Sequence, residues 1–283
     1  MSALRDIRKR LHSVESTQKI TRAMEMVAAA RLRRAMIKAE ATAPYATAIE
    51  SLKKRLCQVS DLHHPLFEKR PAKKIAIVVI SADHGLCGAL HTNLFSSVDR
   101  FLEHKSAFGI ELVLVGHKAV SHYSHKSWKV RKQIPQWTSH ITEAFIESLS
   151  SELLQAFLNK ELDEVWVVYT HYINMLQREV RIEKFLNIEK KAPEKEIRDD
   201  YIFEPSPLQV VDAFLPRYCR YKIRWYLDQS YQSELSSRVV SMRAATKNAD
   251  DVIEKLSHLR DKIRQEIITK EMLEITAGAQ SLK

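Results

Sequence analysis

The sequence contains little glycine. Only five of its 283 residues are of this type, whereas an average globular chain of the same length has about 20. A glycine-rich loop that wraps around phosphate groups is therefore excluded, and long helices are favoured. The five stand at Gly85, Gly88, Gly109, Gly116 and Gly278.

Cysteine is also scarce. Cys57, Cys87 and Cys219 are odd in number, lie far apart and form no C-x-x-C pair. This pattern indicates neither a disulfide framework nor a zinc knuckle. We therefore expect a protein of a reducing compartment, with no metal and no cofactor of its own.

Long apolar runs are missing as well. The longest, IAIVVI, spans Ile75 to Ile80 and is far shorter than the roughly 20 residues that cross a bilayer. The basic N-terminus is typical of a transit peptide, but Asp6 and Glu15 interrupt it and the helical pattern runs on. We predict no membrane span and take residue 1 as the start of the working protein.

The charge is unevenly distributed. The formal net charge is +10, and residues 1–56 carry about +8, residues 57–216 about −2 and residues 217–283 about +4. The densest cluster is RLRR at 31–34, with Lys19, Arg22 and Lys38 nearby. Clustered positive charge on a rigid helix favours association with an acidic protein surface.

Two segments lack both glycine and proline. Residues 1–43 and 217–277 read as helices of roughly 60 and 90 Å at 1.5 Å per residue. The apolar stripe of the second has the period of a coiled coil, and an antiparallel pairing would bury both stripes. The stripes consist of Leu4, Ile7, Leu11, Val14, Ile20, Met24, Val27, Ala28, Leu32 and Ala35 in the first segment and Leu235, Val239, Met242, Thr246, Ala249, Ile253, Leu256, Ile263 and Ile267 in the second.

Strands and helices alternate between these segments. This order predicts a Rossmann-like α/β domain with a mostly parallel sheet. We expect three parts: an N-terminal coiled-coil helix (1–58), an α/β domain (70–205) and a C-terminal coiled-coil helix (207–283). Pro216 should end or kink the helix that begins near Pro207. The predicted strands are 73–82, 110–116, 163–172 and 179–188, and the predicted helices are 88–104, one from 118, and 142–159.

The segment SADHGLCG, residues 81–88, is the most enzyme-like stretch. It brings Asp83, His84 and Cys87 to a loop between a strand and a helix, where a thiolate could be stabilised. It matches neither the P-loop pattern nor G-x-S-x-G. We therefore favour a structural loop formed by Asp83, Gly85 and Gly88, and keep a small α/β enzyme as the alternative.

Two further patterns suggest binding. His117, His122 and His125 lie close together, but no third anionic ligand follows at a matching spacing, so an exposed helix is favoured over a metal site. RYCRYKIRWY, residues 217–226, interleaves arginine with aromatic residues, as nucleic-acid surfaces do. An amphipathic helix with one wet basic face explains it equally well, and a basic coiled-coil nucleic-acid-binding protein stays as an alternative.

Several motifs resemble one family. They are IRKRLHSVESTQKITRAMEMVAAARLRRA near the start, SADHGLCGALHTNLF at 81–95, YIFEP at 201–205, SMRAATKNADDVIEKL at 241–256 and IRQEIITKEMLEITAGAQSL at 263–282. In this order, over nearly the whole chain, they are similar to the γ subunits of F-type ATP synthases.

The resemblance implies a rotor that is not itself catalytic. In that family the terminal helices form an antiparallel coiled coil inside a hexamer of α and β subunits, and the α/β domain is a foot that contacts the ε subunit and the c-ring. ATP chemistry belongs to the β subunits. The resemblance thus implies a subunit that couples proton-driven rotation to ATP synthesis or hydrolysis. We expect it at the cytoplasmic face of a bacterial inner membrane, attached only through the complex and without nucleic acid.

The resemblance also implies contact residues. The foot contact to the c-ring and ε is expected at Tyr201, Phe203 and Glu204. Lys270, Leu273 and Pro216 depart from the usual family pattern, and a regulatory insertion with two cysteines, typical of the chloroplast form, is absent from the sequence. Contacts to the α/β hexamer are expected at Lys19, Arg22, Met24, Arg31, Arg33, Arg34, Arg243, Lys270, Glu271, Glu274, Ile275, Ala279 and Leu282.

Overall fold

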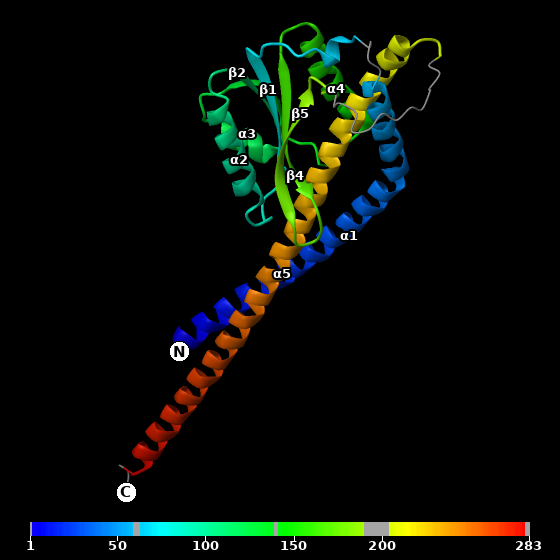
Figure 1. Ribbon diagram of the computed structural model, residues 1–283. Coiled ribbons are helices and arrows are strands. Elements are labelled where there is room, and N and C mark those ends of the chain that lie inside the picture. The colour runs from blue at the N-terminus through cyan, green and yellow to red at the C-terminus, as the bar shows by residue number, and fades with distance from the viewer. Residues whose placement is uncertain (1, 59–62, 139–140, 190–203, 281–283) are drawn as a thin grey trace. The chain divides into compact units, whose positions relative to one another are not determined.

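The computed structural model describes residues 2–58, 63–138, 141–189 and 204–280 (Figure 1). The chain divides into two compact units. Unit 1 consists of residues 1–29 and 238–283, and unit 2 of residues 30–237. Helix α1 (Ser2–Gln58) and helix α5 (Pro207–Gln280) are long enough to belong to both units: each has one segment in unit 1 and another in unit 2. None of the described helices is both long enough and apolar enough to cross a membrane.

Both long helices contain a proline. Pro44 lies within α1 and Pro216 within α5, although a proline inside a helix removes one hydrogen bond and costs about 3 kcal/mol. Pro216 therefore does not end its helix. Its neighbours Leu215 and Tyr218 are buried in the core of unit 2, and this packing holds the helix across the break in the hydrogen-bond ladder.

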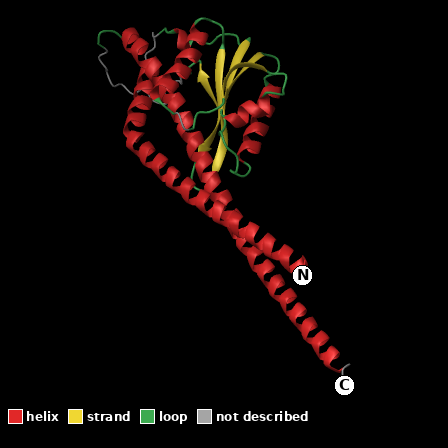
Figure 2. Ribbon diagram, turned by 180° about the vertical axis from the view of Figure 1, so that it is seen from behind, coloured by secondary structure: helices red, strands yellow, loops and turns green. Residues whose placement is uncertain are grey.

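Unit 1 is an antiparallel helix pair, as the sequence predicted (Figures 1 and 2). Thr21 Oγ1 lies 2.8 Å from Thr246 Oγ1, and Arg243 Nε donates to Glu25 Oε1 at 2.8 Å. Gln18 bonds to Asp250 in the same way. Residue numbers on α5 fall as those on α1 rise, so the two helices run in opposite directions.

The seam on α1 contains polar residues that an apolar pattern misses. The predicted members Ile20 and Val27 are wrong, because 58% and 52% of their surfaces are exposed. At least half-buried side chains instead recur at steps of three and four, the period of a coiled coil. The observed α1 seam is Leu4, Ile7, Leu11, Val14, Gln18, Thr21, Glu25 and Ala28.

Unit 2 is built on a five-stranded sheet in the order β3-β2-β1-β4-β5. Strands β1 to β4 are parallel, and β5 pairs antiparallel with β4. Every residue of β1 except Lys74 is buried, because a strand at the centre of a parallel sheet is covered on both faces. The strands are β1 (Lys74–Ile80), β2 (Gly109–Val115), β3 (Lys129–Ile134), β4 (Glu164–Tyr172) and β5 (Arg178–Leu186).

Helices cover both faces of this sheet (Figure 2). Helices α2 (Leu90–His104) and α3 (His117–Tyr123) pack on one face, with Ile75, Ile77 and Val79 of β1. Helix α4 (Glu143–Leu158), the short 3₁₀ helix η1 (Pro65–Phe67) and the unit 2 segment of α5 pack on the other. The expected α/β fold is confirmed, and β3 is an additional strand that the sequence pattern did not predict.

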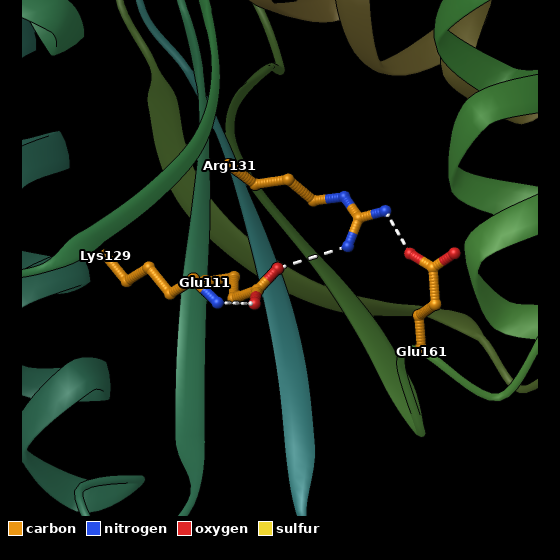
Figure 3. Close-up of polar contacts among 4 residues, drawn as sticks. All are labelled: Glu111, Lys129, Arg131 and Glu161. Carbon is orange, nitrogen blue, oxygen red and sulfur yellow. Dashed lines mark hydrogen bonds and ion pairs between the residues drawn. The ribbon is translucent and has the colours of Figure 1, made fainter.

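An ionic cluster joins β2, β3 and the turn after α4 (Figure 3). Glu111 of β2 accepts from Lys129 at 2.6 Å and from Arg131 at 3.1 Å, and Arg131 also bonds to Glu161 at 2.6 Å. The hydrogen bond from Lys129, aided by Arg131, holds the pKa of Glu111 below its usual value, although burial acts in the opposite direction. These pairs tie the edge strand β3 to its neighbours.

We expect Glu111→Gln to lower the free energy of unfolding by about 1–2 kcal/mol at neutral pH. The folded-state pKa of Glu111 is depressed, so its stabilisation is complete above the ordinary value of 4.5. It is lost as the pH falls through the folded-state pKa. Urea unfolding at neutral pH and at about pH 3 should therefore show the two proteins converging in acid. A difference that stays constant would contradict this, and Glu103→Gln, an exposed site on α2, is the control.

Gly116 occupies a position that no other residue fits. Its φ is +97°, and an added Cβ would lie 2.2 Å from the carbonyl oxygen of Ser81. Gly116→Ala should therefore destabilise unit 2 by about 3 kcal/mol or more, from both strain and overlap. Denaturant unfolding measures this effect. Gly85→Ala, where the nearest atom is 3.8 Å away, should be nearly neutral, and equal effects of the two changes would refute the explanation.

Candidate functional site

Four candidate contact residues of unit 1 lie on or beside the helix seam. Lys19 and Arg22 are exposed, whereas Met24 is half-buried. The side chain of Arg243 crosses the seam and pairs with Glu25, and 70% of the Arg243 side chain is exposed. Arg243 therefore has a role within the helix pair and leaves most of its surface for another partner.

The RLRR cluster belongs to unit 2. Arg31, Arg33 and Arg34 are exposed around Leu32, which is 2% exposed and anchors this turn. Arg31 and Arg34 border a cavity of about 330 Å³ that also contains Asp228. Burial raises the pKa of Asp228 despite the nearby Arg224. The arginines thus form a cationic surface held in place by one buried leucine.

The last turns of α5 carry uncovered apolar side chains. Every residue from 268 to 277 is exposed, because α5 extends beyond the start of α1. If the register of Thr21 opposite Thr246 is continued, the first residue of α1 lies opposite about residue 266 of α5. Lys270 pairs with Glu274 at 4.0 Å, and Ile275 is 73% exposed. An exposed i,i+4 ion pair contributes only a few tenths of a kcal/mol. This surface is suited to contact with another chain.

Some candidate residues fall outside what the structure describes. Tyr201, Phe203 and Leu282 lie outside the described residues, and for Ala279 only the helical backbone is described. Glu204, by contrast, is described by the structure and is exposed. The foot contact therefore stays a prediction.

Asp83 joins three loops at the carboxyl ends of the parallel strands. Its Oδ2 accepts from the backbone N–H groups of Trp137 at 3.1 Å and Thr138 at 2.9 Å, and from the Thr138 hydroxyl at 2.6 Å. Its Oδ1 accepts from the His117 N–H at 3.4 Å. Trp137 in turn donates its indole N–H to the Ser81 carbonyl at 2.7 Å. A buried carboxylate bonded in this way fixes the loops that follow β1, β2 and β3.

In this loop, Asp83 and the Cys87 thiol bond to backbone groups. Cys87 is 1% exposed, and its thiol donates to the His84 carbonyl at 3.9 Å, whereas the His84 side chain is exposed. Asp83 bonds to other loops, so it does not orient an imidazole as a triad requires. Gly88 has φ +57°, which glycine adopts without strain, but the backbone at Gly85 is outside the left-handed region.

His117 and His122 lie on α3, whereas His125 follows the end of this helix, so the expected placement of His122 and His125 on one helix is wrong. His122 stacks on Phe95 with ring centroids 4.2 Å apart, and its Nε2 lies 3.7 Å from Asp99. Burial, then the charge of Lys126, lowers the pKa of His122 despite Asp99. Within the described ranges, no three His, Cys, Asp or Glu side chains are grouped so that they could hold a metal ion.

The arginine-aromatic stretch of α5 packs against unit 2. Arg220 bonds to Glu147 of α4 at 2.6 Å, and Arg224 bonds to Glu143. The aromatic rings Tyr218 and Tyr226 are buried in the core. A nucleic-acid surface needs exposed rings and unpaired cations, so packing explains this pattern.

The chain is similar to known proteins over its full length. Residues 3–282 match the family model described as ATP synthase. The chain is 46% identical to the ATP synthase gamma chain of Protochlamydia amoebophila (strain UWE25) and 34% identical to that of Glaesserella parasuis serovar 5 (strain SH0165). Both alignments cover 100% of each chain.

Solved structures show the same fold. A chain of the Euglena gracilis mitochondrial ATP synthase, OSCP/F1/c-ring in rotational state 3, matches with a TM-score of 0.71 at 17% identity, covering 99% of this chain and 95% of that one. A chain of the Tetrahymena thermophila mitochondrial ATP synthase central stalk and c-ring matches with a TM-score of 0.60 at 22% identity, covering 80% and 99%. Together with the full-length relatives, these findings show that the chain belongs to the family of ATP synthase gamma chains.

Proposed function

We propose that this chain is the central stalk of an F1 sector and turns inside a hexamer of α and β subunits. The observation that supports this best is unit 1, where two helices from opposite ends of the chain are locked in register by polar pairs. Two paired helices resist twisting better than one, because any relative sliding breaks the bonds between them. Such a pair is suited to transmitting torque.

Rotation would act on ATP through unequal contacts. A β subunit changes conformation only as far as the stalk binds its states with different free energies. Each tenfold change in nucleotide affinity requires about 1.4 kcal/mol of such difference. An asymmetric stalk therefore imposes three different equilibria on three identical subunits, and proton-driven turning of a c-ring would drive ATP synthesis.

The stalk itself would not catalyse. The loop with Asp83 and Cys87 is tied up in structural hydrogen bonds, which supports a subunit whose chemistry lies in its β partners. We further propose that the complex, with an ε subunit and a c-ring, sits at the cytoplasmic face of a bacterial inner membrane. The chain would reach the membrane only through these partners. No relative found supports the nucleic-acid alternative.

The exposed side chains suggest how the hexamer is contacted. The cationic surface of Arg31, Arg33 and Arg34 would meet acidic segments of β, with Lys19 and Arg22 adding to it. The uncovered end of α5, with Ile275, would turn in an apolar collar. Lys270, Glu271 and Glu274 would contact the α/β hexamer, and Tyr201, Phe203 and Glu204 would contact the c-ring.

Rotation of the reconstituted complex tests this function. With α and β subunits fixed to a surface and a bead attached to this chain, ATP should produce stepwise rotation in one direction. The chain alone should hydrolyse no ATP, and Cys87→Ser should rotate like the unmodified protein. Hydrolysis by the complex without rotation, or ATP hydrolysis by the isolated chain, would contradict the proposal.

The cationic surface makes a separate prediction. Replacing Arg31, Arg33 and Arg34 with glutamine should slow association with the α/β hexamer about tenfold at low salt, because clustered charge steers encounter. The difference should shrink as salt screens the charges. Stopped-flow mixing measures the rate. The control replaces Lys54, Lys69 and Arg100, also exposed, and an equal slowing in the control would show that only net charge matters.

A further inference from the structure

A polar cavity lies where the strand order of unit 2 changes direction. Strand β1 has β2 on one side and β4 on the other. The chain leaves β1 through α2 on one face and reaches β4 through α4 on the other. In open sheets of this kind, ligands bind outside the carboxyl ends of the strands at such a switch point. The cavity is therefore in a position where this class of fold binds small molecules.

The cavity has a volume of about 320 Å³ and a largely polar lining. Asn93 lies in the second turn of α2, Thr170 in the last part of β4, and Arg178 begins β5. Ser237 of α5 closes one side, and its hydroxyl already donates to the Cys87 carbonyl at 2.7 Å. Asn93 is exposed, so its amide is available as a donor.

Arg178 is the unusual member of this lining. Its Nη1 has no contact with solvent and no hydrogen-bond partner in the described part of the chain. A buried donor left unsatisfied costs about 1–3 kcal/mol, and more when it is charged, so native structures seldom keep one without a reason. The adjacent Glu179 bonds instead to Arg181. The positive charge of Arg178 is thus not neutralised by its neighbour.

We infer that this cavity binds a phosphate group, with Arg178 as the main ligand and Asn93 as a second donor. The planar guanidinium matches two phosphate oxygens at once. Arg178 as a whole is only half-buried, so a turn of its side chain would bring the unsatisfied nitrogen to a bound anion. The phosphate is either inorganic or the terminal group of a nucleotide. This binding goes beyond the rotor function and does not depend on it.

Equilibrium dialysis of the full-length chain against radiolabelled orthophosphate, and separately against ADP, tests the inference. The unmodified chain should bind one phosphate or one ADP saturably. Arg178→Met, which keeps the apolar stem, should weaken binding at least tenfold. Arg217→Met removes the same charge from an exposed arginine elsewhere in unit 2 and should leave binding unchanged. If only one ligand binds, it identifies the source of the phosphate.

Glu179→Gln separates a lost site from a misfolded variant. Removing this carboxylate from the rim should tighten binding two- to fivefold, which a folding defect would not do. The inference is overturned if neither orthophosphate nor ADP binds saturably, if Arg178→Met binds as well as the unmodified chain, or if Arg217→Met weakens binding as much as Arg178→Met does.

Discussion

The register between α1 and α5 is the interaction on which unit 1 depends. Gln18, Thr21 and Glu25 meet Asp250, Thr246 and Arg243 across a seam that is otherwise largely apolar. An apolar seam alone would tolerate a slip of three or four residues with modest loss. Polar partners do not tolerate it, because each would face an apolar side chain and lose its hydrogen bond. The polar pairs in the middle of the seam thus fix the register of the two helices, whereas the ends of the seam bury apolar side chains.

Much of the fold could be predicted from the sequence, and the gaps have physical causes. The long helices and four strands were visible because their apolar residues follow a helical period or form buried runs. Strand β3 was missed since KVRKQI is an edge strand whose charged side chains pair with neighbours such as Glu111. Of the two expectations for Pro216, an ended helix or a kinked one, the ended helix is wrong, because core packing overrides the local preference of one residue.

The candidate site was less predictable. Exposed arginines such as Arg33 can be named from charge alone, but the pairing of Arg243 with Glu25 joins residues 218 positions apart. Asp83 could be placed in a loop, whereas its partners Trp137 and Thr138 lie in the loop after β3, more than 50 residues further along the chain. The polar seam had a usable signal: counting every third and fourth position from Leu4, whatever its polarity, reaches Gln18, Thr21 and Glu25.

The burial of two cysteines has a practical meaning for measurement. Cys87 and Cys219 are each 1% exposed, and burial raises the pKa of the Cys219 thiol to about 12. Maleimides and similar reagents attack the thiolate of an accessible cysteine, so both are shielded. Cys57, half-buried near the end of α1, is the thiol nearest to solvent. A fluorophore would therefore report from one defined point of unit 2 without any engineered residue.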